Sequence, residues 1–363
     1  MDKKLLAIFV VSIITLATIL FYFSISQTSI QSSPENLEEC KTFHYSKENA
    51  INLVFFSDEE TTKKYSEFLF QVEPFTEKDF NIYFIDSYKP ECELYKDIAL
   101  FCHSKDLIKK STSCPNDFII VPEKKSYEIR SSSYMNILSI NTEHPLSVLA
   151  HEFGHAFANL AEEYVPAKIP SKSKNCVSSC EEFDDKFAEC FEGCSESNYF
   201  RSIDSGIMRS LSANRYGAFD ENLISELIKK STSITGRAIS NPIDCANEKY
   251  ILLEGNYDSE KNNIEIIKKT IEQGCAGTNG NGNFNFTLID SENSEISSRA
   301  FNPELIFTDA PENETIDGEI FKNEGEFYLK LPIISSADKL EILHNNKITE
   351  VTLKDVGATI CLK

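Results

Sequence analysis

The chain has 363 residues, of which 41% are hydrophobic and 26% charged, so it is long enough for two globular domains and is not expected to be disordered. Its formal net charge of −21 argues against nucleic-acid binding and against a basic patch that holds an anionic membrane surface.

The chain begins with an uncharged apolar run of 19 residues, Leu5 to Phe23, preceded by Lys3 and Lys4. This run is long enough to cross a bilayer as a helix, and the lysines place its N-terminus on the cytoplasmic side. Residues 1–23 are therefore predicted to be a transmembrane signal-anchor, with a cleaved signal peptide as the alternative. Residues 24–39 are polar and are predicted to be a tether, which puts the rest of the chain outside the cytoplasm, either membrane-anchored or secreted.

Strand-like and helix-like segments alternate from about Cys40 to Tyr164, the pattern of an α/β (α+β) layer structure. The expected strands are Ile51–Phe56, Phe80–Ile85 and Phe118–Val121, with an edge strand within Tyr127–Ile140; the expected helices are Asp58–Phe70, Ile98–Lys110 and Asp220–Lys230. Residues 40–235 are therefore predicted to form one domain, with a cysteine-rich insert at residues 165–198.

Residues 248–363 contain short strand-like runs separated by turn residues, which predict an all-β sandwich as a second, accessory domain. The expected strands are Tyr250–Leu253, Ile264–Ile271, Asn283–Ile289, Glu326–Leu331 and Lys339–Leu343.

Eleven cysteines in a chain that carries an export segment favour disulfide bonds. Four of them, Cys176, Cys180, Cys190 and Cys194, form two C-x3-C pairs in the polar segment 165–198. Each pair spans one helical turn, so two turns could be cross-linked as a helical hairpin, Cys176 to Cys194 and Cys180 to Cys190. A second zinc ion bound by the four thiolates is the alternative.

The most informative stretch is Pro145 to Tyr164, P-L-S-V-L-A-H-E-F-G-H-A-F-A-N-L-A-E-E-Y, which contains H-E-x-x-H at His151, Glu152 and His155. On a helix the apolar residues of this stretch share one face and the two histidines lie together on the other. Imidazoles at i and i+4 can bind one zinc ion, while Glu152 is turned aside and can take a proton from water. The spacing therefore predicts a zinc hydrolase with Glu152 as general base.

A third zinc ligand must come from beyond the histidines. The metzincin pattern H-E-x-x-H-x-x-G-x-x-H is not met, since alanines stand at its glycine and last-ligand positions. On an unbroken helix Glu162 would stand about 16 Å along the axis from His151, too far to share an ion. The helix is therefore predicted to end near Asn159, which tolerates the left-handed conformation, with Glu162 as the third ligand and Glu163 as the alternative.

These residues resemble a known family. His151-Glu-Phe-Gly-His155 and the following L-A-E-E-Y are similar to the motif H-E-F-G-H-S-F-x-x-L-A-D-E-Y of zinc metallopeptidases related to bacterial IgA-specific metalloendopeptidase, and S-G-I-M-R, ending at Arg209, is similar to their S-I-M-R segment. The resemblance covers about residues 51–230 and implies a metzincin-like zincin domain with Met208 as the methionine turn under the zinc. Glu162 stands where the family has aspartate.

Met208 and Tyr216 each have two possible roles. Met208 is either that methionine turn or a core residue, since methionine commonly fills gaps. Tyr216, eight residues later, could donate a hydrogen bond to a developing oxyanion, with packing as the alternative.

Together these features predict an extracytoplasmic, membrane-tethered zinc endopeptidase that acts on protein or peptide substrates and has no nucleic-acid partner. One alternative is an inactive peptidase-fold protein that serves in surface binding or adhesion. Another is a zinc amidase that acts on an envelope polymer.

Overall fold

The computed structural model of the chain describes residues 37–183, 189–233, 244–258, 261–277, 282, 284–303, 306–307 and 324–353. The predicted transmembrane segment and most of the predicted tether lie outside these ranges. Within them, no helix is both long enough and apolar enough to cross a bilayer.

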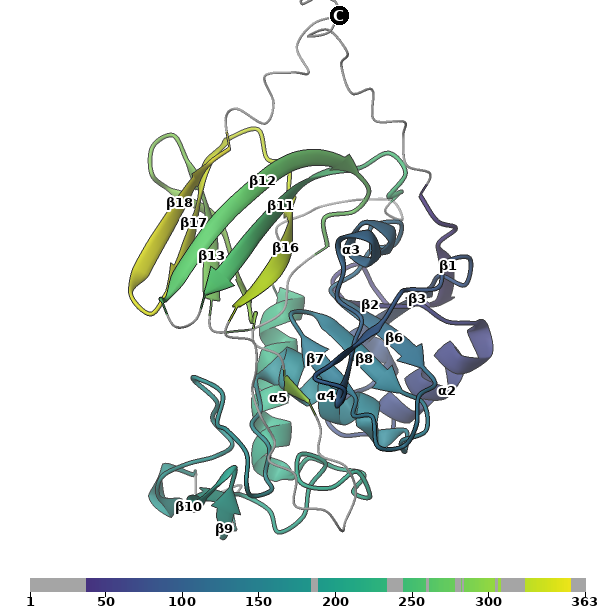
Figure 1. The fold of residues 1–363 in the computed structure, drawn as a ribbon, viewed down its shortest axis with the longest axis vertical. Helices are drawn as coiled ribbons and strands as arrows, with labels where there is room; N and C mark the ends of the chain where they lie inside the picture. Colours follow the sequence, from purple (N-terminus) through teal and green to yellow (C-terminus); the bar gives the residue numbers. More distant parts are fainter. Residues whose placement is uncertain are drawn as a thin grey trace, which may run out of the picture. The chain divides into compact units, whose positions relative to one another are not determined.

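Among the described residues, seven strands form the sheet on which the first half of the chain is built (Figure 1). The strand order is β1-β3-β2-β6-β8-β7-β15, with β1 (Lys41–His44), β2 (Ile51–Phe55), β3 (Phe80–Phe84), β6 (Phe118–Glu123), β7 (Ser132–Tyr134), β8 (Ile137–Asn141) and β15 (Ile306–Phe307). The four central strands β3, β2, β6 and β8 run parallel, and the remaining strands pair antiparallel.

The helices of the described ranges are α2 (Glu59–Leu69), α3 (Lys105–Ser111), α4 (Ser147–Ala158) and α5 (Ala218–Ser233). Single 3-10 turns occur at Glu77–Asp79 and Cys180–Glu182. α2 begins where Asp58 accepts a hydrogen bond from the Thr61 backbone N–H, so its predicted position is confirmed.

Two predicted elements are wrong in detail. The expected helix Ile98–Lys110 is a strand, β5 (Ala99–Phe101), followed by α3, because Ser104 caps the Leu107 N–H and starts the helix there. β5 pairs with β4 (Glu93–Tyr95). The expected edge strand within Tyr127–Ile140 is a β7–β8 hairpin, and β8 lies inside the sheet.

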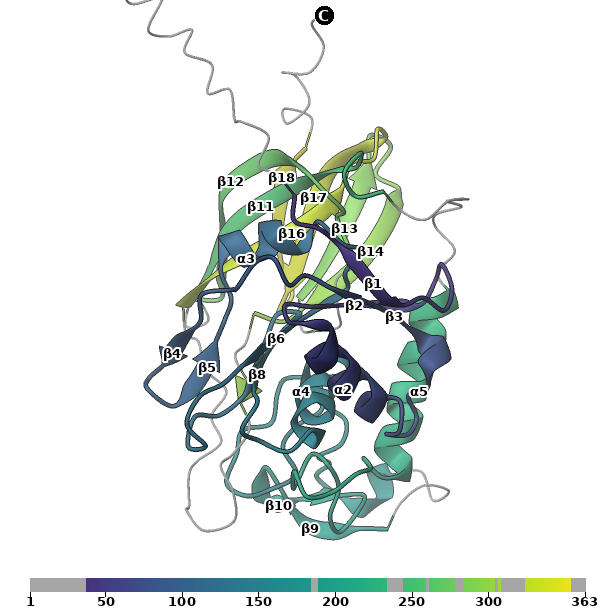
Figure 2. The ribbon, with the colours of Figure 1, turned by 90° about the vertical axis from the view of Figure 1, so that its right-hand side faces the viewer.

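One face of the large sheet is covered by helices. Figures 1 and 2 show α2 and α4 side by side, and residues of both enter one core with alternate residues of the central strands. The core includes Leu53, Phe55, Ile82, Ile120 and Leu138 from the sheet, Tyr65 and Leu69 from α2, and Phe153 and Phe157 from α4. Because side chains alternate along a strand, the neighbouring residues of the same strands face the other way.

The opposite face packs against both α3 and the C-terminal part of the chain. Val54, Ile119 and Ile137 of the sheet share a core with Leu107 of α3 and Leu252 of β11. β11 (Lys249–Asp258) is the middle strand of the sheet β12-β11-β16, with β12 (Asn263–Gln273) and β16 (Glu324–Pro332).

A third sheet, β14-β13-β17-β18, faces the second. It contains β13 (Phe284–Asp290), β14 (Glu295–Phe301), β17 (Ala337–His344) and β18 (Lys347–Thr352). Phe286, Leu288 and Ile342 of this sheet pack with Ile251 and Leu253 of β11 in a core that also takes residues from the β5 and β7 regions.

These contacts correct the predicted fold class. The described residues form one mixed α/β structure with several sheets, not a metzincin-like α+β domain followed by a separate all-β sandwich. The physical reason is that β11 uses both faces: Leu252 packs toward the first sheet and Leu253 toward the third. The short β15 also pairs directly with β7 of the first sheet.

Candidate metal centre

Helix α4 presents the predicted histidines beside its buried apolar face. Phe153 and Phe157 pack on the sheet, stacked with ring centroids 5.2 Å apart. The helix ends as predicted, because Asn159 adopts the left-handed conformation with φ 52° and ψ 37°. The Leu160 N–H then bonds back to the Gly154 carbonyl at 3.2 Å, and this turns the chain toward the histidine side.

This turn brings Glu162 to His151 and His155. The Nε2 atoms of the two histidines lie 3.0 Å apart, and Glu162 Oε1 lies 3.3 Å from His151 Nε2 and 3.1 Å from His155 Nε2. Among the described residues, these three form the one group of three or more potential ligands whose donor atoms lie within 4.8 Å of one another. All three side chains are buried.

In both histidines a hydrogen bond from Nδ1 to the backbone determines that Nε2 faces the cluster. His151 Nδ1 lies 2.8 Å from the Ile207 carbonyl oxygen, and His155 Nδ1 lies 2.7 Å from the Leu160 carbonyl oxygen. Because a carbonyl oxygen only accepts, each Nδ1 atom carries a proton and each Nε2 atom faces the cluster.

The three donors fit a metal ion. Two imidazole lone pairs and a carboxylate that face one another at 3.0–3.3 Å repel unless a cation or a proton lies between them. Tetrahedral zinc with bonds of about 2.0–2.1 Å separates its ligand atoms by about 3.3 Å, close to these spacings. A buried cluster with the composition of a metal site is thus present, and its chemistry suits zinc.

His151 and Glu162 shift each other's pKa values. Burial lowers the pKa of His151, but the Glu162 carboxylate outweighs it and raises the pKa to about 9. Burial raises the pKa of Glu162, but the two histidines outweigh it and lower the pKa to about 2. The carboxylate therefore stays ionised near neutral pH.

Glu152, the predicted base, is fully buried and adjacent to the cluster. Its charge contributes to the raised pKa of His151. On the helix it stands about 80° around the axis from the midpoint of the two histidines, so it can approach the cluster without being a ligand.

Glu163, the alternative third ligand, points elsewhere. It is buried against Asp220 of α5, and the two carboxyl groups interact. Burial raises the pKa of Glu163 to about 8, and burial together with the Glu163 charge raises the pKa of Asp220. The geometry thus places Glu162, and not Glu163, with the histidines.

Met208 and Tyr216 both pack against α4 beside Gly154. A Cβ added at Gly154 would lie 2.8 Å from Met208 Sδ and 3.0 Å from Tyr216 Cε1. The Met208 carbonyl accepts the Glu163 N–H at 2.8 Å, which ties this turn to the segment that carries Glu162. The Tyr216 hydroxyl is buried and donates to the Ala150 carbonyl, as the packing interpretation expects.

The cysteine-rich segment is cross-linked as a nested pair, Cys176–Cys194 and Cys180–Cys190, so these thiols are not zinc ligands. The predicted helical hairpin is wrong: the cysteines lie in loops, a single 3-10 turn and the strand β9 (Phe191–Cys194), which pairs with β10 (Glu196–Arg201). Among the described residues ten cysteines form five disulfides, the others being Cys40–Cys114, Cys92–Cys102 and Cys245–Cys275. Such a set indicates an oxidising, extracytoplasmic compartment.

Sequence reasoning missed two polar side chains that hold the ligand segment. Asn175 bonds both backbone groups of Ala161, and Ser195 donates to the Glu162 carbonyl. Neither residue lies in a recognisable motif, so only the fold reveals them.

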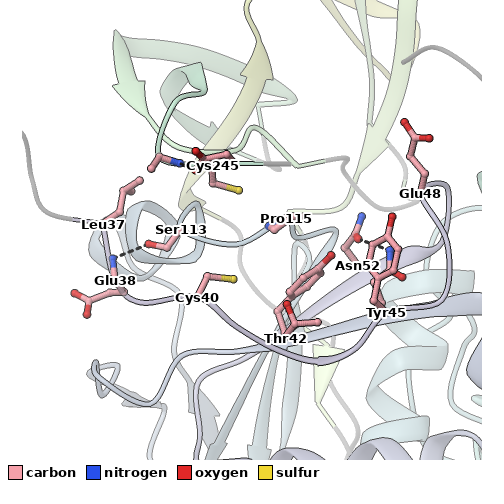
Figure 3. Close-up of a pocket in the computed structure, with 14 residues that line it drawn as sticks. Leu37, Glu38, Cys40, Thr42, Tyr45, Glu48, Asn52, Ser113, Pro115 and Cys245 are labelled. Atoms are coloured by element: carbon pink, nitrogen blue, oxygen red, sulfur yellow. Dashed lines mark hydrogen bonds between the residues drawn. The ribbon is translucent and has the colours of Figure 1, made fainter. Parts of the chain in front are cut away.

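A cavity of about 650 Å³ lies elsewhere, between the start of the described chain and the Cys245 segment (Figure 3). None of the three ligand residues lines it. Two of its polar lining groups are bonded within the protein: Asn52 donates to Asp117 at 3.0 Å, and the Glu38 carboxylate accepts from Lys110 at 2.8 Å. The metal-ligand cluster is therefore the stronger functional candidate.

Comparison with models of known protein families gives no match for this sequence, and comparison with curated proteins gives none either.

Proposed function

We propose that the protein is an extracytoplasmic zinc-dependent endopeptidase. The observation that carries this proposal is the convergence of His151, His155 and Glu162 on one point, with Glu152 between the two histidines on helix α4. Three protein ligands leave a fourth tetrahedral position, the arrangement of catalytic zinc sites, whereas structural sites use four protein ligands.

Each side chain has a distinct task in this proposal. His151, His155 and Glu162 would hold the ion, and the Ile207 and Leu160 carbonyls would keep both imidazoles in the ligating tautomer. When bound, zinc supplies Lewis acidity toward a carbonyl and lowers the pKa of a water toward about 7. Glu152 would accept the proton of the attacking water and deliver it to the leaving amine.

The surroundings strengthen this chemistry. His151 and His155 are each 2% exposed and Glu152 is fully buried, and charges act more strongly where water is excluded. The five disulfides support proteins outside the cytoplasm as the substrate class.

The same burial favours a second candidate. A metal held in so closed a cluster could stabilise a binding or adhesion protein that has no hydrolytic activity. The two candidates differ in turnover and not in metal content.

The decisive experiment compares the zinc-loaded wild type with Glu152→Gln on casein, an unstructured protein. The amide keeps the side-chain size, so both proteins should bind one zinc ion per chain. Peptide-bond cleavage should fall by about 10²–10⁴-fold in the variant, the usual contribution of a general base. Equal cleavage by the two proteins contradicts the proposed role of Glu152, and bound zinc without cleavage of casein or of a peptide library supports the binding protein.

A further inference from the structure

The third ligand reaches the histidines on a segment that has no regular secondary structure. Residues 159–163 follow α4 in neither a helix nor a strand, so the hydrogen bonds of a sheet or helix do not fix Glu162. Other contacts must hold the Glu162 backbone in position, because a carboxylate displaced by one ångström would no longer share an ion with the two histidines.

The cysteine-rich segment provides that support from one side. The Asn175 side chain acts as a neighbouring strand would: its Oδ1 accepts the Ala161 N–H at 2.7 Å and its Nδ2 donates to the Ala161 carbonyl at 3.0 Å. One residue on, the Ser195 hydroxyl donates to the Glu162 carbonyl at 2.7 Å. Asn175 and Ser195 are both buried, at 0% and 1% exposure, so water does not replace these bonds.

The Cys176–Cys194 disulfide joins the two supporting residues. Cys176 directly follows Asn175, and Cys194 directly precedes Ser195. Both sulfurs contact the ligand segment, since Cys176 Sγ lies 3.5 Å and Cys194 Sγ 4.0 Å from the Glu162 carbonyl oxygen. Together with Ala161 the two cysteines form a small buried cluster of their own.

We propose that Asn175 and Ser195, locked together by the Cys176–Cys194 disulfide, are positioning residues for the metal ligand Glu162. This inference rests on the proposed metal site. It adds that tight metal binding at this site requires the Cys176–Cys194 disulfide. The chain would therefore acquire its full metal affinity only after this bond has formed.

A matched pair of disulfide variants tests the inference in the full chain. Cys176→Ala/Cys194→Ala removes the bond that contacts Glu162, and Cys180→Ala/Cys190→Ala removes the second disulfide of the same segment, whose cysteines are exposed. The readout is the zinc dissociation constant, measured by competition with a chromophoric chelator. Affinity should fall about 10–100-fold in the first variant, the usual effect of losing an outer support of a ligand, and less than about threefold in the second.

A single substitution separates positioning from general stability. Ser195 has a left-handed backbone with φ 57°, which glycine adopts without strain. The relief of this backbone strain offsets the loss of the buried hydrogen bond to Glu162. Ser195→Gly should therefore leave the thermal midpoint of the metal-free protein close to that of the wild type while it weakens zinc binding at least about fivefold. Its zinc site, probed by X-ray absorption, should show weaker carboxylate coordination.

The outcomes separate the inference from the proposed function. Zinc affinities of the Cys176/Cys194 and Ser195 variants within threefold of wild type overturn the positioning role and leave the peptidase proposal intact. A wild type that binds zinc but cleaves no protein overturns the peptidase proposal alone, since the affinity comparison still stands. A wild type that binds no zinc overturns both.

Discussion

Two adjacent glutamates after α4 occupy different environments. Glu162 joins the histidines, whereas Glu163 lies against Asp220. We expect Glu162→Gln to weaken zinc binding at least about 100-fold, because a neutral amide replaces the one anionic ligand. Glu163→Gln, a change of the same size one residue away, should alter the zinc dissociation constant less than threefold. Equal losses in chelator competition would contradict the ligand assignment.

Lys330 of β16 has a buried amine that contacts two uncharged polar side chains. Its Nζ donates to Asn116 Oδ1 and lies 3.3 Å from Ser111 Oγ. Burial lowers its pKa from 10.5 to about 7, with Asp117 acting in the opposite direction. Between these values the unfolded chain binds a proton that the folded protein does not, so Lys330 makes stability rise with pH from about 7 toward 10.5.

The check is the free energy of unfolding between pH 7.5 and 9.5 for the wild type and Lys330→Met. The wild type should gain up to about 1.4 kcal/mol per pH unit more than the variant. Methionine keeps the length of the side chain but does not titrate. Parallel pH profiles would show that Lys330 is charged in the folded protein.

Within helix α4, Gly154 is set by packing and not by helix formation. Alanine there would gain about 1 kcal/mol of helix propensity, but its Cβ would lie 2.8 Å from Met208 Sδ and 3.0 Å from the Tyr216 ring. Overpacking of a core typically costs about 1–3 kcal/mol, so Gly154→Ala should be destabilising by about 1 kcal/mol in thermal or denaturant unfolding. In a Met208→Ala background the contact with Met208 Sδ is gone and only the one with the Tyr216 ring remains, so the cost should be smaller. A stabilising Gly154→Ala would refute the close contact.

The elements that the sequence predicts well are those with local signals. The H-E-x-x-H spacing predicts the histidine face, and the failure of an unbroken helix to bring Glu162 within reach predicts the helix end at Asn159, which the structure confirms. The cysteine segment is different, because the C-x3-C spacing fits a helical turn but the cysteines lie in loops, a single 3-10 turn and a strand. Asn175 and Ser195 carry no local signal, since their partners are backbone groups 14 and 33 residues away.

At the scale of the molecule, the sequence suggests a domain boundary that the packing does not follow. Tyr250–Leu253 reads as a short strand of a separate sandwich, and periodicity along one strand cannot reveal that each of its faces meets a different sheet. Leu252 and Tyr250 join the core on the first sheet, and Ile251 and Leu253 join the core on the third. Packing between residues far apart in the sequence decides domain organisation, and it cannot be predicted from the composition of a segment.

The shared cores predict cooperative unfolding. Calorimetry of the disulfide-intact chain should give one transition, with equal calorimetric and van't Hoff enthalpies, because the C-terminal sheets cannot separate without exposing the face of the first sheet. Two resolved transitions would restore the picture of independent domains.

The central claim is that His151, His155 and Glu162 hold zinc. Anomalous diffraction at the zinc edge from crystals of the zinc-supplied protein tests it most directly. The account predicts one ion about 2.0–2.1 Å from both Nε2 atoms and about 2.0–2.2 Å from a Glu162 carboxylate oxygen. An anomalous peak elsewhere, or none between these three side chains at full zinc supply, would contradict it.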